Sequence, residues 1–209
     1  AMPAQNSSII SEQRAFSHVS NKGIEERILF ADKEDCEVFL SYLEEYLSPQ
    51  KDSESTKQVF KIRGRKFRGT PHLPKNYFKH IELIAYNLMP DHFHLIVHEL
   101  TDGATENFMR SLCTRYSMHF NKKYKRVGSL FQAVYKAVLV THEEQFIYLR
   151  KYIHKQALAL QGETLRGQPS SYPEYLGLIK TEWIHPEEIL NYFSKTNTKL
   201  SYKSFVESE

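Results

Sequence analysis

The sequence is poor in cysteine and in long apolar runs, and each shortage excludes a class of protein. Its 209 residues include only two cysteines, Cys36 and Cys113, which are far apart and form no Cys-x-x-Cys pair. A disulfide framework and a cysteine-rich zinc site are therefore unsupported, and a reducing cytosol fits best. No segment approaches the roughly 20 apolar residues that cross a membrane, and the first residues contain no apolar stretch after a basic start, so we expect neither a membrane span nor a signal peptide.

The chain also lacks internal repeats, low-complexity segments and a strong net charge. The net charge is only +3, with a pI near 8.7, so the overall balance permits a nucleic-acid partner without arguing for one. Hydrophobic residues make up 41% of the chain and aromatic residues 13%, which is enough to build a packed core. The sequence thus predicts a folded protein in which the distribution of charge matters more than its sum.

Hydrophobic periodicity predicts an alternation of strands and helices. The segments with period-two alternation or strand-length apolar runs are 15–23, 81–90, 92–100 and 129–140. The segments with apolar residues at helical spacing are 31–48, 105–124, 141–160 and 186–193. Pro90 and Asp91 separate two of the strand runs, which favours an antiparallel hairpin. Asp32 is the expected cap of the first helix, and Thr141-x-x-Glu144 forms a capping-box pattern at the start of the third.

This order of elements predicts an α+β fold of the ferredoxin-like type. The first six elements read β-α-β-β-α-β, a split sheet with helices on one face and the other face free for a site. We expect a polar leader at 1–14, a main domain at 15–160 that includes an added C-terminal helix, and a helical extension at 161–209. Residues 51–80 interrupt the domain as an insertion rich in Lys and Arg, which has room for a short hairpin.

Three histidines lie in a strand that otherwise reads as buried. Side chains at i, i+2 and i+6 point to the same side of a strand, so His92, His94 and His98 share a face with Ile96. The opposite face, which the helices would cover, takes Phe93, Leu95 and Val97. Two neutral imidazoles about 7 Å apart can converge on one divalent ion, with a third ligand from elsewhere. A histidine-triad hydrolase would need a histidine in place of Ile96, and a barrel amidohydrolase would need a longer chain, so neither fits.

A second constellation lies on the helix predicted at 141–160. Tyr148, Tyr152 and Gln156 follow one another at i+4 steps, which places Tyr152 and Gln156 on one face about 6 Å apart between Cβ atoms. Such a stripe alone is more typical of a core. A phenol, with a pKa near 10, is a weak nucleophile at neutral pH, so a covalent tyrosine mechanism needs a metal ion to polarise the electrophile. Two histidines and an amide could meet that need.

Five stretches of the sequence carry a resemblance to a known family. They are HVSNKGIEERILF (18–30), YNLMPDHFHLIVHE (86–99), RYSMHFNKKYKRVGSLFQAVYKAVLV (115–140), YLRKYIHKQAL (148–158) and SSYPEYLG (170–177). In this order the chain resembles the single-tyrosine HUH transposases, and within them the REP-associated tyrosine transposases and their insertion-sequence relatives. The resemblance implies that 15–160 is a catalytic domain. Such a domain would bind single-stranded, hairpin-bearing DNA ends, cleave with a tyrosine, and leave a 5′-phosphotyrosine and a free 3′-hydroxyl.

The resemblance assigns roles residue by residue. The family's His-hydrophobe-His pair falls on His92 and His94, its nucleophile on Tyr152 and its amide-bearing metal ligand on Gln156, with Mg²⁺ or Mn²⁺ as the ion. Many REP-associated members end this helix with Tyr-Ile-x-x-Asn-Pro, whereas Gln156 is closer to the insertion-sequence enzymes, so the subgroup stays open. Tyr148, one turn earlier, is an alternative nucleophile. His98 has no counterpart in the metal motif, and His154 is expected to point away from the site.

Basic residues gather at 61–69 and 120–128 beside aromatic residues. Basic groups supply phosphate affinity and aromatic rings stack on unpaired bases, although solvated loops have the same composition. With the resemblance, the candidate DNA contacts are Arg63, Arg65, Lys66, Arg68, Lys122, Lys123, Lys125 and Arg126. The expected partner is single-stranded DNA with hairpin ends, and no membrane. A homodimer, with the site completed in cis or in trans, stays open. The implied location is the bacterial cytoplasm, on the nucleoid when DNA is bound.

Three hypotheses differ in what the protein does to its substrate. In the first it is a DNA strand transferase, in which Tyr152 attacks a phosphodiester while His92, His94 and Gln156 hold the metal ion. In the second it is a non-catalytic, domesticated descendant of the same fold that binds structured single-stranded DNA through the basic insertion. In the third it is a metal phosphohydrolase acting on nucleotides, which would release its product without a protein–DNA bond.

Overall fold

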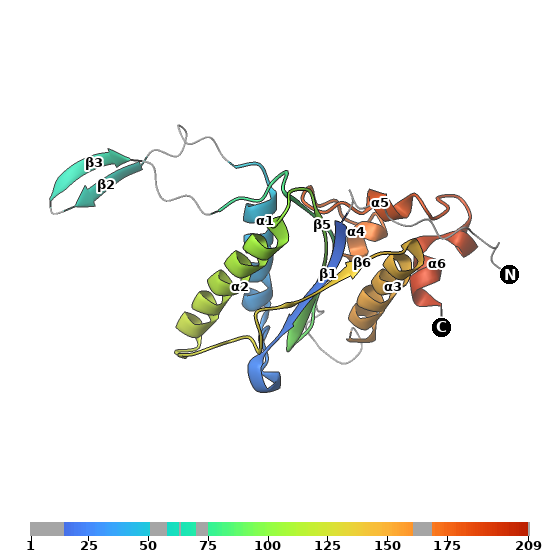
Figure 1. The fold of residues 1–209 in the computed structure, drawn as a ribbon, viewed down its shortest axis with the longest axis horizontal. Helices are drawn as coiled ribbons and strands as arrows, with labels where there is room; N and C mark the ends of the chain where they lie inside the picture. Colours follow the sequence, from blue (N-terminus) through green and yellow to red (C-terminus); the bar gives the residue numbers. More distant parts are fainter. Residues whose placement is uncertain (1–14, 51–57, 63, 70–74, 161–168, 209) are drawn as a thin grey trace.

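A four-stranded antiparallel sheet forms the centre of the molecule (Figure 1). The structure, a computed structural model, describes residues 15–50, 58–62, 64–69, 75–160 and 169–208, so the predicted leader at 1–14 lies outside it. The strands of the sheet are β1 (Ala15–Lys22), β4 (Ile81–Leu88), β5 (His92–Glu99) and β6 (Lys136–Val140). Their spatial order is β4-β5-β1-β6, with each neighbouring pair antiparallel. This is the order of a split β-α-β-β-α-β sheet, which confirms the ferredoxin-like prediction.

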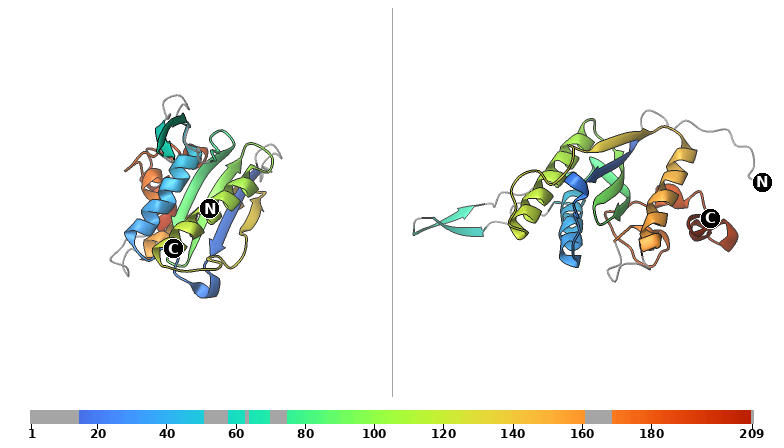
Figure 2. Two further views of the ribbon diagram at one scale, coloured as in Figure 1. Left: turned by 90° about the vertical axis from the view of Figure 1, so that its left-hand side faces the viewer. Right: turned by 90° about the horizontal axis from the view of Figure 1, so that it is seen from below.

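Two helices cover one face of the sheet, α1 (Lys33–Leu47) and α2 (Ala104–Lys123). Figure 2 shows them side by side in front of the strands. Helix α1 begins where predicted, because the Asp32 carboxylate accepts a hydrogen bond of 3.0 Å from the backbone N–H of Asp35. The core between these helices and the sheet takes the alternate β5 residues Phe93, Leu95 and Val97. The predicted division of β5 into two faces is therefore confirmed.

The opposite face of the sheet is not free, and that expectation was wrong. Helix α3 (Glu143–Leu160) crosses it, and the chain beyond α3 forms short helices, of which α6 packs against α3 (Figure 1). These are α4 (Tyr172–Tyr175), α5 (Glu187–Leu190), η2 (Thr198–Leu200) and α6 (Tyr202–Glu207). A second core forms there around Phe16, Ile84 and Ile96. A bulge between Leu83 and Ala85 breaks the alternation of β4 and places both Ile84 and Ala85 in this core.

Two predicted elements are shorter in the structure than in the sequence pattern. Only 136–140 of the strand predicted at 129–140 is regular, because the preceding residues run as a loop against the end of β1. The helix predicted at 186–193 contracts to the single turn of α5. The 3-10 helix η1 (Ile24–Glu26) follows β1. None of the helices in the described ranges is both long and apolar enough to span a membrane.

The basic insertion contains the hairpin that its composition suggested. Strands β2 (Gln58–Ile62) and β3 (Arg65–Gly69) pair antiparallel with each other and with no strand of the main sheet. Gly64, in the turn, has φ +82°, a conformation that favours glycine. In Figure 1 the hairpin extends beyond the α1 side of the body. The exposed side chains of Arg65 and Lys66 are thus carried on a separate projection.

Candidate active site

The first pair of predicted site residues lies at the start of β5. The rings of His92 and His94 have centroids 4.9 Å apart. His92 Nδ1 lies 2.7 Å from the Asp91 carboxylate, and His94 Nδ1 lies 2.8 Å from Nε2 of His18 on β1. Because a carboxylate accepts a proton from the Nδ1–H of His92, the lone pair of that ring is on Nε2. Both imidazoles are therefore oriented through Nδ1, and His92 offers Nε2 as a ligand atom.

His94 is held in its neutral form by its surroundings. Burial, and to a lesser extent the neighbouring His18 and His92, lower the pKa of His94 to about 3. Burial also lowers the pKa of His18. His94 Nε2 is buried and has no hydrogen-bond partner among the described residues. A buried nitrogen without a partner costs free energy, which binding of a metal ion would relieve.

The second pair lies on α3, which the sheet itself positions. Asn87 on β4 pairs with His94 in the strand register, and its side-chain N–H donates a 3.0 Å hydrogen bond to the backbone oxygen of Ile153. Tyr152 is next in the chain, and its ring lies edge-on to the His94 ring with centroids 6.2 Å apart. Gln156 Nε2 donates a 2.8 Å hydrogen bond to the Tyr152 hydroxyl oxygen. The structure thus brings all four predicted site residues together within one chain.

The donor atoms of this cluster fit a divalent cation. Gln156 Oε1, like His94 Nε2, is buried without a hydrogen-bond partner in the described part of the chain. No group of three or more His, Cys, Asp and Glu side chains there could hold a metal ion, so a site depends on the two histidines together with the amide. Two imidazole nitrogens and one amide oxygen are suitable ligands for Mn²⁺, and for Mg²⁺ when phosphate oxygens complete its shell.

Helix α3 is anchored by residues that follow it in the chain. His154 is fully buried, as its expected direction away from the site requires. Its Nδ1 lies 2.7 Å from the Tyr202 hydroxyl and its Nε2 lies 2.9 Å from the Ser171 hydroxyl. Arg150 is also fully buried, with its guanidinium 3.6 Å from the centroid of the Phe146 ring. These contacts fix which face of α3 turns toward the histidines, and Tyr152 is on that face.

The alternatives considered for the site residues have other positions. Tyr148 is exposed, and its ring packs on the ring of Phe205 in α6, with centroids 5.9 Å apart. It therefore faces the C-terminal segment of the chain. His98 lies on the same face as His94 but pairs with Glu82 across the strands, with 2.8 Å between Nδ1 and Oε2. The Phe16 ring stacks on it at 4.5 Å. His98 therefore belongs to the second core, which gives it a structural role.

The predicted DNA contacts divide into three groups. Arg65 and Lys66 are exposed on the β2–β3 hairpin, and Lys122 and Lys125 are exposed around the C-terminal end of α2. Arg63 lies outside the described residues, and of Arg68 the structure describes only the backbone. Arg126 donates a 2.9 Å hydrogen bond to Asn121, which orients its guanidinium.

Lys123 has a different role from the other basic residues near it. Its ammonium group donates hydrogen bonds of 2.8 Å to Asp32 and 2.9 Å to Asp35, and lies 2.9 Å from Glu34. Three carboxylates therefore surround the charge and tie the end of α2 to the start of α1. We remove Lys123 from the set of candidate phosphate contacts for this reason.

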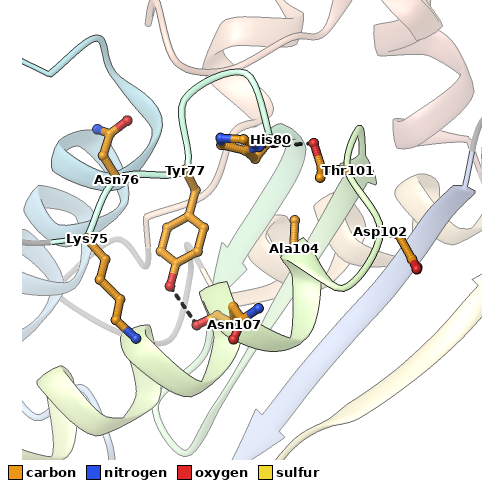
Figure 3. A pocket seen from close by; sticks show the side chains of 8 residues that line it. All are labelled: Lys75, Asn76, Tyr77, His80, Thr101, Asp102, Ala104 and Asn107. Atoms are coloured by element: carbon orange, nitrogen blue, oxygen red, sulfur yellow. Dashed lines mark hydrogen bonds between the residues drawn. The ribbon is translucent and has the colours of Figure 1, made fainter.

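A separate cavity lies at the far end of the sheet from the histidines (Figure 3). It has a volume of about 390 Å³ and lies where β4 begins and β5 ends. His80 Nδ1 lies 3.0 Å from the Thr101 hydroxyl, and the Tyr77 hydroxyl donates to the backbone oxygen of Asn107 at 2.8 Å. None of the predicted site residues lines it, so we do not include it in the candidate site.

Sequence reasoning missed the residues that orient the predicted ligands. His18 and Asn87 come from strands β1 and β4 on either side of β5, and neither follows from the spacing of the metal motif. A signal for His18 existed, because it opens the first of the stretches that carry the family resemblance. Asn87 could have been suspected as a polar residue in an apolar strand, where a buried amide needs hydrogen-bond partners.

The comparisons with known proteins point to one family. Residues 75–156 match the family described as transposase, IS200-like, and this range includes His92, His94, Tyr152 and Gln156. Among solved structures the chain is similar to a REP-associated tyrosine transposase bound to a REP hairpin, with a TM-score of 0.47 and 10% identity over 96% of this chain and 97% of that chain. It is also similar to a protein provisionally described as a transposase from Deinococcus radiodurans R1, with a TM-score of 0.40 and 14% identity over 74% and 98% of the two chains. No curated protein matches the sequence at a significant level.

Proposed function

Because residues 75–156 match the IS200-like transposase family, we propose that this chain is a metal-dependent strand transferase that cleaves and rejoins hairpin-bearing single-stranded DNA through a 5′-phosphotyrosine intermediate. One observation carries the proposal. The Tyr152 ring lies 6.2 Å from the His94 ring, in a cluster where His94 Nε2 and Gln156 Oε1 are buried ligand atoms without partners in the described residues. A nucleophile beside unsatisfied metal ligands is the arrangement that tyrosine-dependent phosphodiester exchange needs.

The chain's own residues prepare the ligands and the nucleophile. His92, His94 and Gln156 would hold Mg²⁺ or Mn²⁺, which when bound would withdraw charge from the phosphate and stabilise the departing oxygen. Asp91 and His18 orient the two imidazoles through Nδ1, and partners of this kind raise metal affinity about 10- to 100-fold. The amide N–H of Gln156 points at the Tyr152 oxygen and stabilises negative charge that develops on it.

Cleavage exchanges one phosphodiester bond for another. The Tyr152 oxygen attacks phosphorus, a bond from phosphorus to that oxygen forms, and the bond from phosphorus to the 3′-oxygen of the DNA breaks. Tyr152 is 54% exposed, so its hydroxyl proton passes to solvent, and the departing 3′-oxygen takes a proton from solvent. Rejoining reverses these steps with a 3′-hydroxyl attacking the phosphotyrosine. Because the number of phosphodiester bonds is conserved, the reaction needs no energy-rich co-reactant.

The basic residues outside the site would hold the DNA around this centre. Arg65 and Lys66 on the hairpin, and Lys122 and Lys125 near the end of α2, have side chains that reach solvent. Such groups bind phosphates without reading sequence, which suits a substrate recognised by its hairpin shape. In this proposal the protein acts in the bacterial cytoplasm, with the nucleoid as its source of DNA.

A covalent adduct is the direct test. A pool of single strands with a fixed hairpin, randomised flanks and a 3′-end label is incubated with Mn²⁺, and the protein is resolved under denaturing conditions. The label must be at the 3′ end because the 5′-phosphate side of the cut stays on the tyrosine. We expect a labelled protein band with the wild type and with Tyr148→Phe, and none with Tyr152→Phe or with EDTA.

The outcomes separate the three hypotheses. An adduct that survives Tyr152→Phe would remove Tyr152 as the nucleophile, and one that survives EDTA would remove the metal. If the wild type binds the pool but never forms an adduct, the protein is a non-catalytic binder of structured DNA. If it releases cut strands with no adduct in a quenched time course, the phosphohydrolase hypothesis is correct instead.

A further inference from the structure

A cavity of about 520 Å³ opens beside the two site histidines. His92 and His94 form one side of it, and Ser20, Lys22 and Lys136 from strands β1 and β6 contribute to the other. We refer to it as the β1–β6 cavity. Its volume lies within the range of small-ligand sites in proteins, which is roughly 300–1,000 Å³.

The β1–β6 cavity and the nucleophile lie on opposite sides of the histidines. In the sheet order β4-β5-β1-β6, His94 on β5 is opposite Asn87 of β4 on one side and Ser20 of β1 on the other. Asn87 holds α3 through the backbone of Ile153, next to Tyr152. The cavity takes its lining from β1 and β6 instead, and neither Tyr152 nor Gln156 contributes to it.

Phosphoryl transfer places the attacking and leaving oxygens roughly in line through phosphorus. If the phosphate lies at the metal ligands and the Tyr152 oxygen approaches from the α3 side, the 3′-oxygen leaves on the opposite side. That side is where the β1–β6 cavity lies. The nucleoside attached to the departing oxygen must then occupy it.

The lining of the cavity suits a nucleotide. Antiparallel partners point to the same side of a sheet, so Lys136 opposite Ser20 and Lys22 opposite His92 share the histidines' face. Both lysines are exposed, and no described residue forms an ion pair with either ammonium group. Asp91 is the acidic residue of the lining, and its carboxylate is already engaged by His92. Two free cations beside the site leave a net positive field for a phosphate.

The wall of the cavity is held in place before any ligand binds. Asn21 is buried and its side-chain N–H donates to the backbone oxygens of Ala133 at 3.2 Å and Val134 at 2.8 Å. The backbone N–H of Gln132 donates to the backbone oxygen of Lys22 at 3.0 Å. These bonds fix the loop that leads into β6 against the end of β1, so the cavity does not depend on a ligand for its shape.

We propose that the β1–β6 cavity binds the terminal nucleotide of the strand that carries the free 3′-hydroxyl, with Lys22 and Lys136 contacting the phosphate on the 5′ side of that nucleotide. The cavity would retain this strand after cleavage and seat the incoming strand for rejoining. This inference rests on the proposed function, because it names the part of the substrate that one side of the same site accepts.

Rejoining kinetics test the proposal. The covalent adduct is formed first, and a labelled single strand with a 3′-hydroxyl is then added at increasing concentration. We expect Lys22→Met and Lys136→Met each to raise the acceptor concentration at half-maximal rate by about tenfold, as loss of one charge-assisted contact predicts. The rate at saturating acceptor should change less than about twofold. The control, Lys195→Met, removes one exposed positive charge far along the chain and should match the wild type.

A second measurement does not depend on catalysis. A short single strand ending in one ribonucleotide is oxidised to a 3′-dialdehyde, bound to the Tyr152→Phe chain and trapped on lysine by reduction. Peptide mapping should find Lys22 and Lys136 labelled several-fold above Lys195. Equal labelling of all three, or unchanged acceptor dependence in both Met variants, overturns the cavity assignment. A wild-type chain that forms no adduct but labels at Lys22 and Lys136 would instead overturn the proposed catalysis and keep the cavity as a DNA-end site.

Discussion

The face of the sheet beneath α3 has an apolar end and a polar end, and the same strands contribute residues to both. At the apolar end, Phe16, Ile84 and Ile96 pack under α3. At the polar end, Ser20 of β1 and His94 of β5 share that face and line an open cavity. Strand alternation therefore determines the sheet face on which a side chain lies. Whether another element covers that part of the face determines whether the side chain joins a core or an open site.

The two histidines on this face of β5 illustrate the same contrast. His98, at the apolar end, pairs with the Glu82 carboxylate and stacks on Phe16. His94, four residues earlier, faces another imidazole and is kept neutral. His98 is thus enclosed by Glu82 and Phe16, whereas His94 lies beside the Tyr152 ring and lines the β1–β6 cavity. One strand thus carries a core histidine, His98, near one end and a histidine of the candidate site, His94, near the other.

Removing side-chain volume at the apolar end should give the largest effect. Ile96→Ala deletes a fully buried side chain, and we expect the free energy of unfolding to fall by about 3 kcal/mol, as for other buried Ile or Leu to Ala changes. Urea denaturation measures it. The control Val138→Ala, at a position 52% exposed on β6, should change the same quantity by less than about 0.5 kcal/mol. A loss below 1 kcal/mol for Ile96→Ala would show that this end is not a core.

Replacing His94 at the polar end should abolish metal binding at a modest cost in stability. His94→Ala removes a buried ring and leaves His18 Nε2 without its partner, so the free energy of unfolding should fall by about 1–2 kcal/mol. Mn²⁺ affinity, measured by calorimetry with the DNA pool present, should fall by more than about a hundredfold, since ligands matter more than their supporting groups. Unchanged Mn²⁺ affinity would contradict the ligand assignment, whatever happens to activity.

The anchor of α3 predicts an intermediate effect on stability. Tyr202→Phe removes the hydroxyl beside His154 Nδ1 and leaves that nitrogen buried without a partner, which costs about 1–2 kcal/mol in the free energy of unfolding. Tyr148→Phe is the matched control, because that residue is 57% exposed. Thermal and urea unfolding of both variants measure the difference. Equal stability of the two would mean that the buried hydrogen bond contributes little to holding α3.

The smallest effect is expected where one imidazole orients another. His18→Phe removes the hydrogen-bond partner of His94 Nδ1, and Mn²⁺ affinity should fall by about tenfold, the lower limit for such supporting groups. His18→Gln restores an acceptor oxygen and should recover most of the affinity. If Phe and Gln behave alike, His18 contributes packing and does not position His94.

Local patterns in the sequence were sufficient for most of the elements and for choosing four residues that the structure brings together, but not for what surrounds them. The alternation of β5 and the Asp32 cap depend on neighbours in the chain, so both were predictable. The pairing of Ser20 with His94, and with Lys136, joins residues far apart in sequence. The β1–β6 cavity follows from that pairing, so the periodicity of a single strand could not have predicted it.

The covered second face was missed for a similar reason. Apolar residues at helical spacing predicted α3, but that spacing does not indicate which face of the sheet the helix will cover. The bulge at Leu83 and Ala85 also breaks the period of two that the prediction assumed. Lys123 shows the same limit for charge, because its carboxylate partners lie in α1 and its cap, and a basic cluster read from sequence cannot reveal them.

The contact between His154 and Tyr202 also sets an order of events while the chain is being made. The ribosome releases α3 before α6, and earlier segments begin to fold first. Until Tyr202 emerges, His154 lacks one of its two buried partners, and α3 has no α6 to pack against. A gene copy with a stop codon shortly before Tyr202 would encode every site residue and still lack the support that keeps Tyr152 beside the histidines. Mutations far downstream of Tyr152 could thus disrupt the candidate site while its four residues stayed intact.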